Sequence, residues 1–247
     1  QLAKILKSHK IDVFETNSKN YKYYVPLKQK KSRLIRAMFE TSTNFQDSLF
    51  YDVSAWTFPL AFNVNHEFLK KELEVVKSFD EPKGKVSNFS DYGYLIKPHD
   101  YNIPKLINSL QEKGIRLKSS SKSFKINSDY FDYGSLLIPV VGQSISSKNI
   151  YDLLNNVSNK TGIDIYALKN GYEDNIGFGS GSFTTIKKPK IGLIVGSGVR
   201  AYDAGEIWHL FDTRYEIPIT KIDIKNLNRV NLSQYTHVIL PSYSGTD

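Results

Sequence analysis

Residues 190–198 read KIGLIVGSG, a largely apolar run that ends in glycines. This pattern is typical of a buried parallel strand that leads into a tight turn. Residues 201–215 (AYDAGEIWHLFDTRY) predict an amphipathic helix, and residues 218–224 (PITKIDI) and 236–245 (THVILPSYSG) predict two further strands. The order strand, helix, strand, strand is that of about half a doubly wound, flavodoxin-like domain, which we expect to occupy residues 188–247.

Composition indicates an ordinary globular protein. The 247 residues suffice for one large domain or for two smaller ones, each with its own core. Of these residues 40% are hydrophobic, and the formal net charge is +8. The lysines are scattered, and only residues 28–36 (KQKKSRLIR) are densely basic. Because no nucleic-acid reader motif accompanies this stretch, we interpret it as the solvated face of a helix and expect no nucleic-acid partner. No apolar run approaches the roughly 20 residues that cross a bilayer, so we expect no membrane span.

The absence of cysteine excludes disulfides, thiolate nucleophiles and cysteine-bound metals. The chain starts at Gln1 without a signal pattern, and it stops at Asp247 before the next helix of the expected domain. We therefore expect the chain to be a segment of a longer protein.

Residues 1–187 contain what we interpret as a diverged internal repeat, with halves 1–85 and 86–187. Each copy predicts a helix, a turn and a strand, followed by a second strand and a helix. Three pairs of residues match: Ile11 with Ile115, Pro26 with Pro139 and, with one gap, Gln29 with Gln143. The offset grows from 104 (115 − 11) to 113 (139 − 26), which predicts an insertion of about nine residues between 119 and 133. One copy alone cannot bury both faces of its strands, so we expect the copies to pair into one sheet of a two-lobed α/β domain.

Three connecting stretches carry further predictions. Residues 45–64 (FQDSLFYDVSAWTFPLAFNV) are rich in aromatic residues, and we favour a buried connector over an aromatic platform for a sugar or peptide. Residues 76–86 (VKSFDEPKGKV) predict a surface linker, and residues 177–183 (GFGSGSF) predict a loop.

Several strings taken together resemble one group of proteins. They are residues 24–29 (YVPLKQ), 50–64 (FYDVSAWTFPLAFNV), 177–183, 190–212 (KIGLIVGSGVRAYDAGEIWHLFD) and 236–245. They are similar to the long region that follows the catalytic domain of large bacterial zinc carboxypeptidase-like proteins. The last part of that region resembles a class I glutamine amidotransferase-like domain.

The resemblance implies that this segment is not an enzyme. The peptidase site of that group needs His-x-x-Glu, and none of the five histidines here has a glutamate three residues later. A glutaminase needs a cysteine nucleophile, which the chain lacks. We therefore expect no catalytic residue, metal ligand or cofactor here, and zinc only in an upstream catalytic domain. The implied partners are that peptidase domain and a peptide or saccharide ligand, in a secreted or periplasmic protein.

The turn after residue 195 is the strongest binding candidate. Backbone N–H groups of Gly196, Ser197 and Gly198 could hold an anion at the start of a helix, with Arg200 supplying charge. In a dinucleotide-binding frame Ala201 takes the place of the third glycine. This motif supports a second hypothesis, a ligand-binding module for a nucleotide or sugar. The alternative is a tight turn that needs glycine for its positive φ.

Asp203, Glu206 and His209 follow one another at intervals of three residues and line one helical face. This spacing invites a metal or acid–base interpretation. We favour a hydrogen-bond network, because three ligands on successive turns of one helix rarely converge on one ion. Asp203 also opens the predicted helix, where an acid stabilises the helix dipole.

Overall fold

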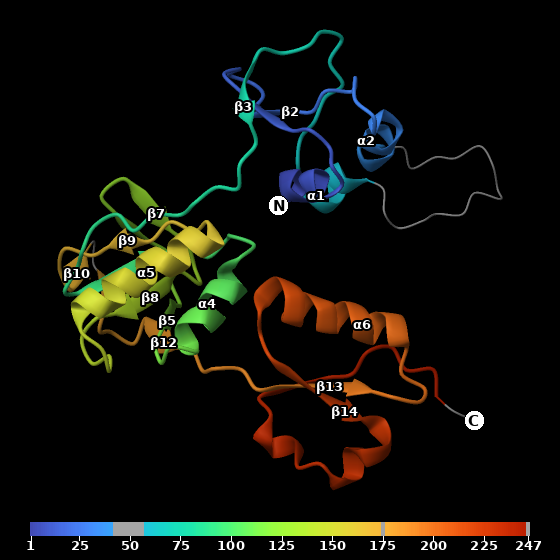
Figure 1. Ribbon diagram of the computed structural model, residues 1–247. Helices are drawn as coiled ribbons and strands as arrows, with labels where there is room; N and C mark the ends of the chain where they lie inside the picture. The colour runs from blue at the N-terminus through green and yellow to red at the C-terminus, as the bar shows by residue number, and fades with distance from the viewer. Residues whose placement is uncertain (42–56, 174–175, 246–247) are drawn as a thin grey trace. The chain divides into compact units, whose positions relative to one another are not determined.

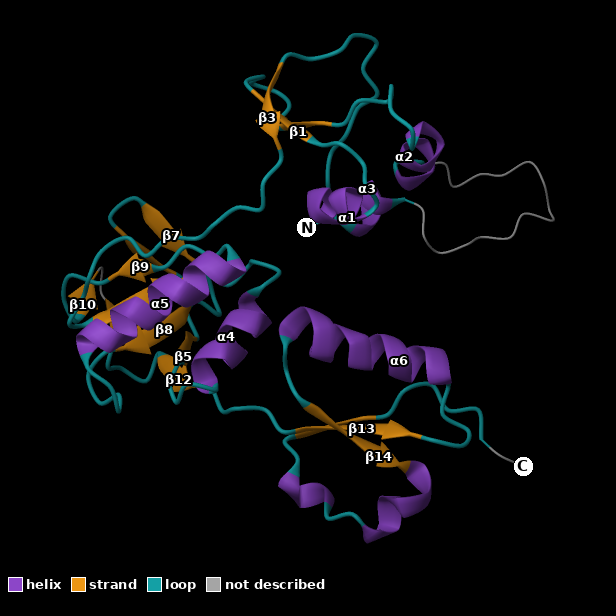
Figure 2. Ribbon diagram, viewed as in Figure 1, coloured by secondary structure: helices purple, strands orange, loops and turns teal. Residues whose placement is uncertain are grey.

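The computed structural model describes residues 1–41, 57–173 and 176–245 (Figure 1). Helices and strands are mixed throughout, which confirms the expected α/β class (Figure 2). The chain separates into two compact units, Gln1–Glu81 and Pro82–Asp247. The domain boundary expected at residue 188 stays a prediction. Within the described ranges no helix is long and apolar enough to cross a membrane.

The first unit packs helices against a small antiparallel sheet of order β2-β1-β3. Its elements are α1 (Leu2–Ser8), β1 (Phe14–Thr16), β2 (Tyr23–Tyr24), α2 (Ser32–Met38), α3 (Phe58–Ala61) and β3 (Val75–Ser78). The buried side chains that hold it together are Leu6, Ile11, Val13, Ile35, Met38 and Phe79. In the basic stretch, Arg33 and Arg36 are exposed on α2 while Ile35 and Met38 face the core, as in an amphipathic helix.

Two predictions for this unit need comment. The linker predicted at 76–86 is partly wrong, because β3 occupies its start and pairs with β1. Extended residues beside an open strand edge satisfy their backbone groups by joining the sheet. The aromatic stretch 45–64 lies largely outside the described residues. Its described end forms α3, in which Pro59 takes an early helical position that needs no N–H donor.

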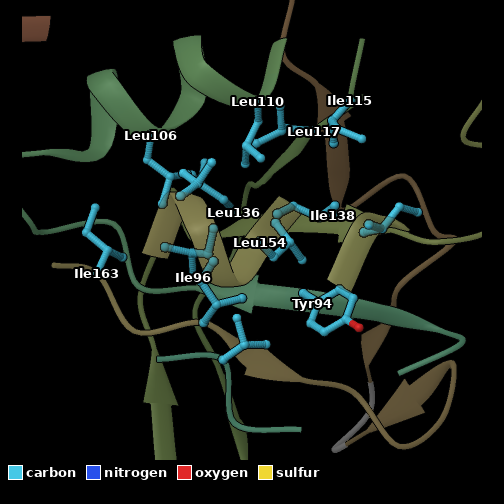
Figure 3. Packing of buried hydrophobic residues seen from close by; sticks show 14 of the residues in the cluster. Tyr94, Ile96, Leu106, Leu110, Ile115, Leu117, Leu136, Ile138, Leu154 and Ile163 are labelled. Carbon is cyan, nitrogen blue, oxygen red and sulfur yellow. The ribbon is translucent and has the colours of Figure 1, made fainter. Parts of the chain in front are cut away.

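The second unit begins with an antiparallel sheet of order β12-β5-β8-β4-β9. Its elements to residue 187 are β4 (Gly93–Ile96), α4 (Ile103–Gln111), β5 (Lys118–Ser120), β6 (Phe124–Ile126), β7 (Asp129–Phe131), β8 (Leu136–Pro139), α5 (Ser147–Thr161), β9 (Tyr166–Ala167), β10 (Tyr172–Glu173), β11 (Ile176–Gly177) and β12 (Phe183–Thr185). Leu106 and Leu110 of α4 project toward the strand residues Tyr94, Ile96 and Ile138 (Figure 3). These five side chains are fully buried, so the helix–sheet contact forms the main core.

Residues matched in sequence make matched contacts in the two units. Gln29 accepts a hydrogen bond from the Asp12 N–H (2.9 Å) and donates to the carbonyl oxygens of Asp12 and Pro26 (3.4 and 2.6 Å). Gln143 accepts from the Arg116 N–H (3.0 Å) and donates to the carbonyl oxygens of Arg116 and Pro139 (2.9 and 2.8 Å). Each glutamine therefore ties the residue after the matched isoleucine to the matched proline.

In each copy a third strand, β3 or β12, also makes its backbone hydrogen bonds to matched residues. The Phe79 N–H donates to the Val13 carbonyl oxygen (2.8 Å), and the Ile186 N–H donates to that of Leu117 (2.9 Å). Each copy is closed by a strand from its own unit, β3 or β12, so the copies form separate sheets. The expectation of one shared sheet is therefore wrong. The hairpin β6–β7 lies where the sequence predicts the insertion in the second copy.

Beyond residue 187 the second unit adds a parallel sheet of order β14-β13-β15. Its elements are β13 (Ile191–Val195), α6 (Ala201–His209), the π-helical η1 (Leu210–Tyr215), β14 (Ile219–Asp223), η2 (Ile224–Arg229), η3 (Leu232–Gln234) and β15 (His237–Ile239). The predicted helix 201–215 thus changes from α to π geometry after His209. The chain passes from β13 through α6 to β14 on one side and later returns to β15 on the opposite side, the strand order expected at the centre of a doubly wound sheet. The flavodoxin-like domain itself stays a prediction.

Candidate functional site

The loop that contains Gly196, Ser197, Gly198 and Arg200 follows the carboxyl end of β13. Because β13 has β14 on one side and β15 on the other, this loop lies at a topological switch point. Open α/β sheets commonly bind ligands at such a point. The fold therefore brings Gly196, Ser197, Gly198 and Arg200 to the place where a binding site is expected.

Both glycines are required by the geometry of the loop. Gly196 has φ +108° and Gly198 has φ +82°, a region that side chains disfavour. A Cβ atom on Gly196 would lie 2.8 Å from an Asp223 carboxylate oxygen, and one on Gly198 would lie 2.6 Å from the Tyr243 ring. The positive φ predicted for a tight turn is present at both positions.

Several N–H groups around the turn already have protein partners. The Val199 N–H donates to the Gly196 carbonyl oxygen (3.1 Å), and the Arg200 N–H donates to that of Ser242 (2.8 Å). The Ser244 N–H in turn donates to the Gly198 carbonyl oxygen (3.0 Å). The loop after β15 is thereby bonded to the glycine turn across the switch point. These backbone bonds stabilise the turn and occupy the N–H groups of the two residues that directly precede α6.

The charged groups around the turn also bond locally. The Asp223 carboxylate accepts a hydrogen bond from the Lys225 N–H (2.9 Å) and so caps η2. The Arg200 guanidinium lies 3.8 Å from the Asp203 carboxylate, and the Arg200 side chain is 69% exposed. An exposed pair of this kind is weak, so the Arg200 charge stays accessible to an anion in solution.

The face of α6 opens onto a hollow of about 600 Å³. The polar and aromatic side chains that line it are Tyr101, Tyr202, Glu206, His209 and Arg214. Asp203 is outside this lining, so the trio predicted from sequence is divided. Within residues 1–41, 57–173 and 176–245, no cluster of three or more histidine, aspartate and glutamate side chains could hold a metal ion.

A smaller hollow of about 340 Å³ lies between α6 and the sheet. Gly196, Trp208 and Lys221 are among its lining residues, and the Lys221 Nζ is 3.9 Å from the centre of the Trp208 ring. This cation–π contact places a positive charge against an aromatic surface. The structure therefore divides the predicted residues between two hollows, with Gly196 at the smaller and Glu206 and His209 at the larger.

Three side chains bind Glu216 beside the larger hollow, and we call this group the Glu216 clamp. The Glu216 carboxylate pairs with Lys105 of α4 (2.7 Å) and Lys160 of α5 (2.8 Å), and its carbonyl oxygen accepts from the Asn108 amide (2.6 Å). Hydrogen bonds from Lys105 and then Lys160 hold the pKa of Glu216 below its usual range. Next to it, the rings of Tyr215 and Tyr101 lie 5.7 Å apart. The clamp therefore holds Tyr101 close to the end of the helix that forms the rest of the hollow.

Sequence analysis missed Tyr101, Tyr202, Arg214, Trp208 and Lys221 at these hollows. Trp208 and Arg214 lie in the predicted helix, whose aromatic and charged face was the available signal. Tyr101 reaches the hollow only through the packing of α4 against η1. Comparison with known protein families, curated proteins and solved structures gave no match for this chain.

Proposed function

We propose that this chain is a non-catalytic accessory segment of a zinc carboxypeptidase-like protein. Its role would be to support an upstream peptidase domain or to hold a peptide or saccharide ligand near it, in a secreted or periplasmic protein. The five strings that resemble the region after the catalytic domain in such proteins support this assignment. Zinc would belong to the peptidase domain.

The observation that carries the proposal is that polar groups of these strings form hydrogen bonds with the backbone of their own unit. In the string YVPLKQ, both the oxygen and the nitrogen of the Gln29 side-chain amide form hydrogen bonds with backbone groups of Asp12 and Pro26. In the glycine turn, the N–H groups of Val199 and Arg200 bond to carbonyl oxygens of the same unit. Groups that are already committed to holding the backbone suit a supporting role better than a reactive one.

A peptidase assay tests this proposal directly. The purified chain, supplied with zinc and a peptide that carries a free carboxyl terminus, is expected to release no amino acid. The same assay after zinc removal is the matched control. Zinc-dependent release of C-terminal residues would contradict a non-catalytic role.

The hollow on α6 favours a second candidate function, a binding module for a nucleotide or sugar. Its volume of about 600 Å³ falls within the range of small-ligand sites, roughly 300–1,000 Å³. Tyr101 and Tyr202 offer ring faces, and Glu206, His209 and Arg214 offer hydrogen-bonding groups. Aromatic faces with convergent polar groups suit the flat, polar surface of a base or a pyranose ring.

A thermal-shift panel of nucleotides and sugars tests the second function. A ligand that binds here should raise the melting temperature of the wild-type chain but not that of Tyr202→Ala. Tyr133→Ala is the matched control, because Tyr133 is 69% exposed and does not line the hollow. Stabilisation by no member of the panel, or equal stabilisation of all three proteins, would count against this site.

A further inference from the structure

In the described part of the chain, strand β2 forms an edge of its sheet, whereas the matched strand β8 in the other unit is internal. Among the described residues, β2 pairs only with β1, with Phe14 opposite Tyr24 and Glu15 opposite Tyr23. Strand β8 pairs in the same register with β5, with Lys118 opposite Leu137 and Ser119 opposite Leu136. Its other edge pairs with β4. The two arrangements differ by one strand: β4 precedes α4 in the second copy, whereas the described residues contain no strand ahead of α1 in the first.

Exposure follows this difference. Leu136, between β4 and β5, is 3% exposed, whereas the matched Tyr23 is 41% exposed. Ile138 is fully buried, whereas the matched Val25 is only half-buried. Apolar and aromatic side chains at this position are therefore covered in one unit and partly open to water in the other.

The alternation of an antiparallel ladder shows which backbone groups of β2 point away from β1, where the described part of the chain offers them no strand. The Thr16 N–H donates to the Lys22 carbonyl oxygen (3.1 Å), so Lys22 and Tyr24 direct their peptide groups toward β1. Tyr23 and Val25 consequently direct theirs away from β1. In the second unit the Val140 N–H donates to the Tyr92 carbonyl oxygen (3.1 Å). By the same alternation, Leu136 and Ile138 direct their groups toward β4.

We propose that the edge of β2 that has no partner within residues 1–41, 57–173 and 176–245 is a docking site for an extended apolar strand. The strand runs antiparallel to β2 and has the side-chain pattern of β4 (Gly93–Ile96). It lies relative to α1 as β4, which precedes α4 in the chain, lies relative to α4. Such strand addition joins main-chain hydrogen bonds to the burial of alternate side chains. It covers an unpaired edge that would otherwise invite aggregation.

A graft in the full chain tests the proposal. Gln1 matches Lys105 (105 − 1 = 104), so the sequence of Tyr92–Pro104 is placed directly ahead of Gln1 to reproduce the spacing between β4 and α4. The control graft carries proline at the copies of Tyr94 and Ile96, which removes the N–H groups that would donate to β2. Hydrogen exchange is followed by NMR at individual amides, and thermal melting is recorded in parallel.

The graft is expected to slow exchange of the Tyr23 and Val25 amides at least tenfold and to raise the melting temperature of Gln1–Glu81 by about 5 °C. The proline graft should leave both unchanged. Unaltered exchange at Tyr23 and Val25 in the first graft would overturn the proposal. Equal protection by both grafts would also overturn it, because an effect without donors on the strand cannot come from pairing with β2.

Discussion

Replacing Gln143 by alanine is expected to weaken the unit Pro82–Asp247 by about 2 kcal/mol. The substitution removes three hydrogen bonds, two to Arg116 and one to Pro139, with distances of 2.8 to 3.0 Å. Each is worth about 1 kcal/mol net. Gln143 is half-buried, so water replaces part of what is lost and the total falls below the full sum.

Native-state hydrogen exchange measures this loss within each unit. A change of about 2 kcal/mol corresponds to an increase of about 30-fold in the exchange rate of the slowest amides, such as those of β8. The slowest amides of β1, in the other unit, should not change. Gln29→Ala should reverse the pattern, because Gln29 makes the matched bonds in Gln1–Glu81. Ser144→Ala is the control, since Ser144 is the exposed neighbour of Gln143.

Two results would refute this reasoning. A rate increase in β8 below about threefold, or no larger than that of Ser144→Ala, would mean that the amide does not hold the strand. Equal acceleration in β1 and β8 by Gln143→Ala would mean that the two units do not unfold separately.

Four further substitutions probe other contacts. Hydrogen bonds from its lysine partners lower the pKa of Glu216, so the ion pairs stabilise the fold above the usual glutamate pKa and are lost as pH falls through the lower pKa of the folded state. Their contribution is less than about 1 kcal/mol, because the pairs are partly exposed. Glu216→Gln should therefore make the melting temperature depend less on pH between about pH 5 and 3. Gly162→Ala should cost more than about 2 kcal/mol in urea unfolding, because its Cβ would lie 2.6 Å from the Pro82 carbonyl oxygen at φ +77°, whereas Gly114→Ala, at φ +75° in open space, should cost about 1 kcal/mol. Equal losses would contradict the clash. Leu154→Ala should cost about 2–5 kcal/mol by the same measurement, because Leu154 is fully buried in the main core, and a loss below 1 kcal/mol would contradict that packing.

The parts of the candidate site that could be predicted are those set by neighbouring residues. An apolar run followed by Gly196 and Gly198 predicts a strand and a turn with positive φ, because both properties depend on only a few consecutive residues. The hollow on α6 could not be predicted in the same way. It requires Tyr101 to meet a helix about one hundred residues later, and the Glu216 clamp that fixes this contact joins groups from three separate elements.

The sequence by itself determined the class of the fold, the strand and turn at 191–198, and the matched positions of Gln29 and Gln143. These features recur locally or within one repeating pattern. Tertiary structure alone decided that the two copies build separate sheets and that β3 joins the sheet of the first copy. It also decided that β8 is internal, whereas β2 is an edge among the residues that the structure describes. The reason is that strand pairing depends on which backbone donors and acceptors meet between segments far apart in the chain. The alternation of side chains along one strand does not show which other strand pairs with it.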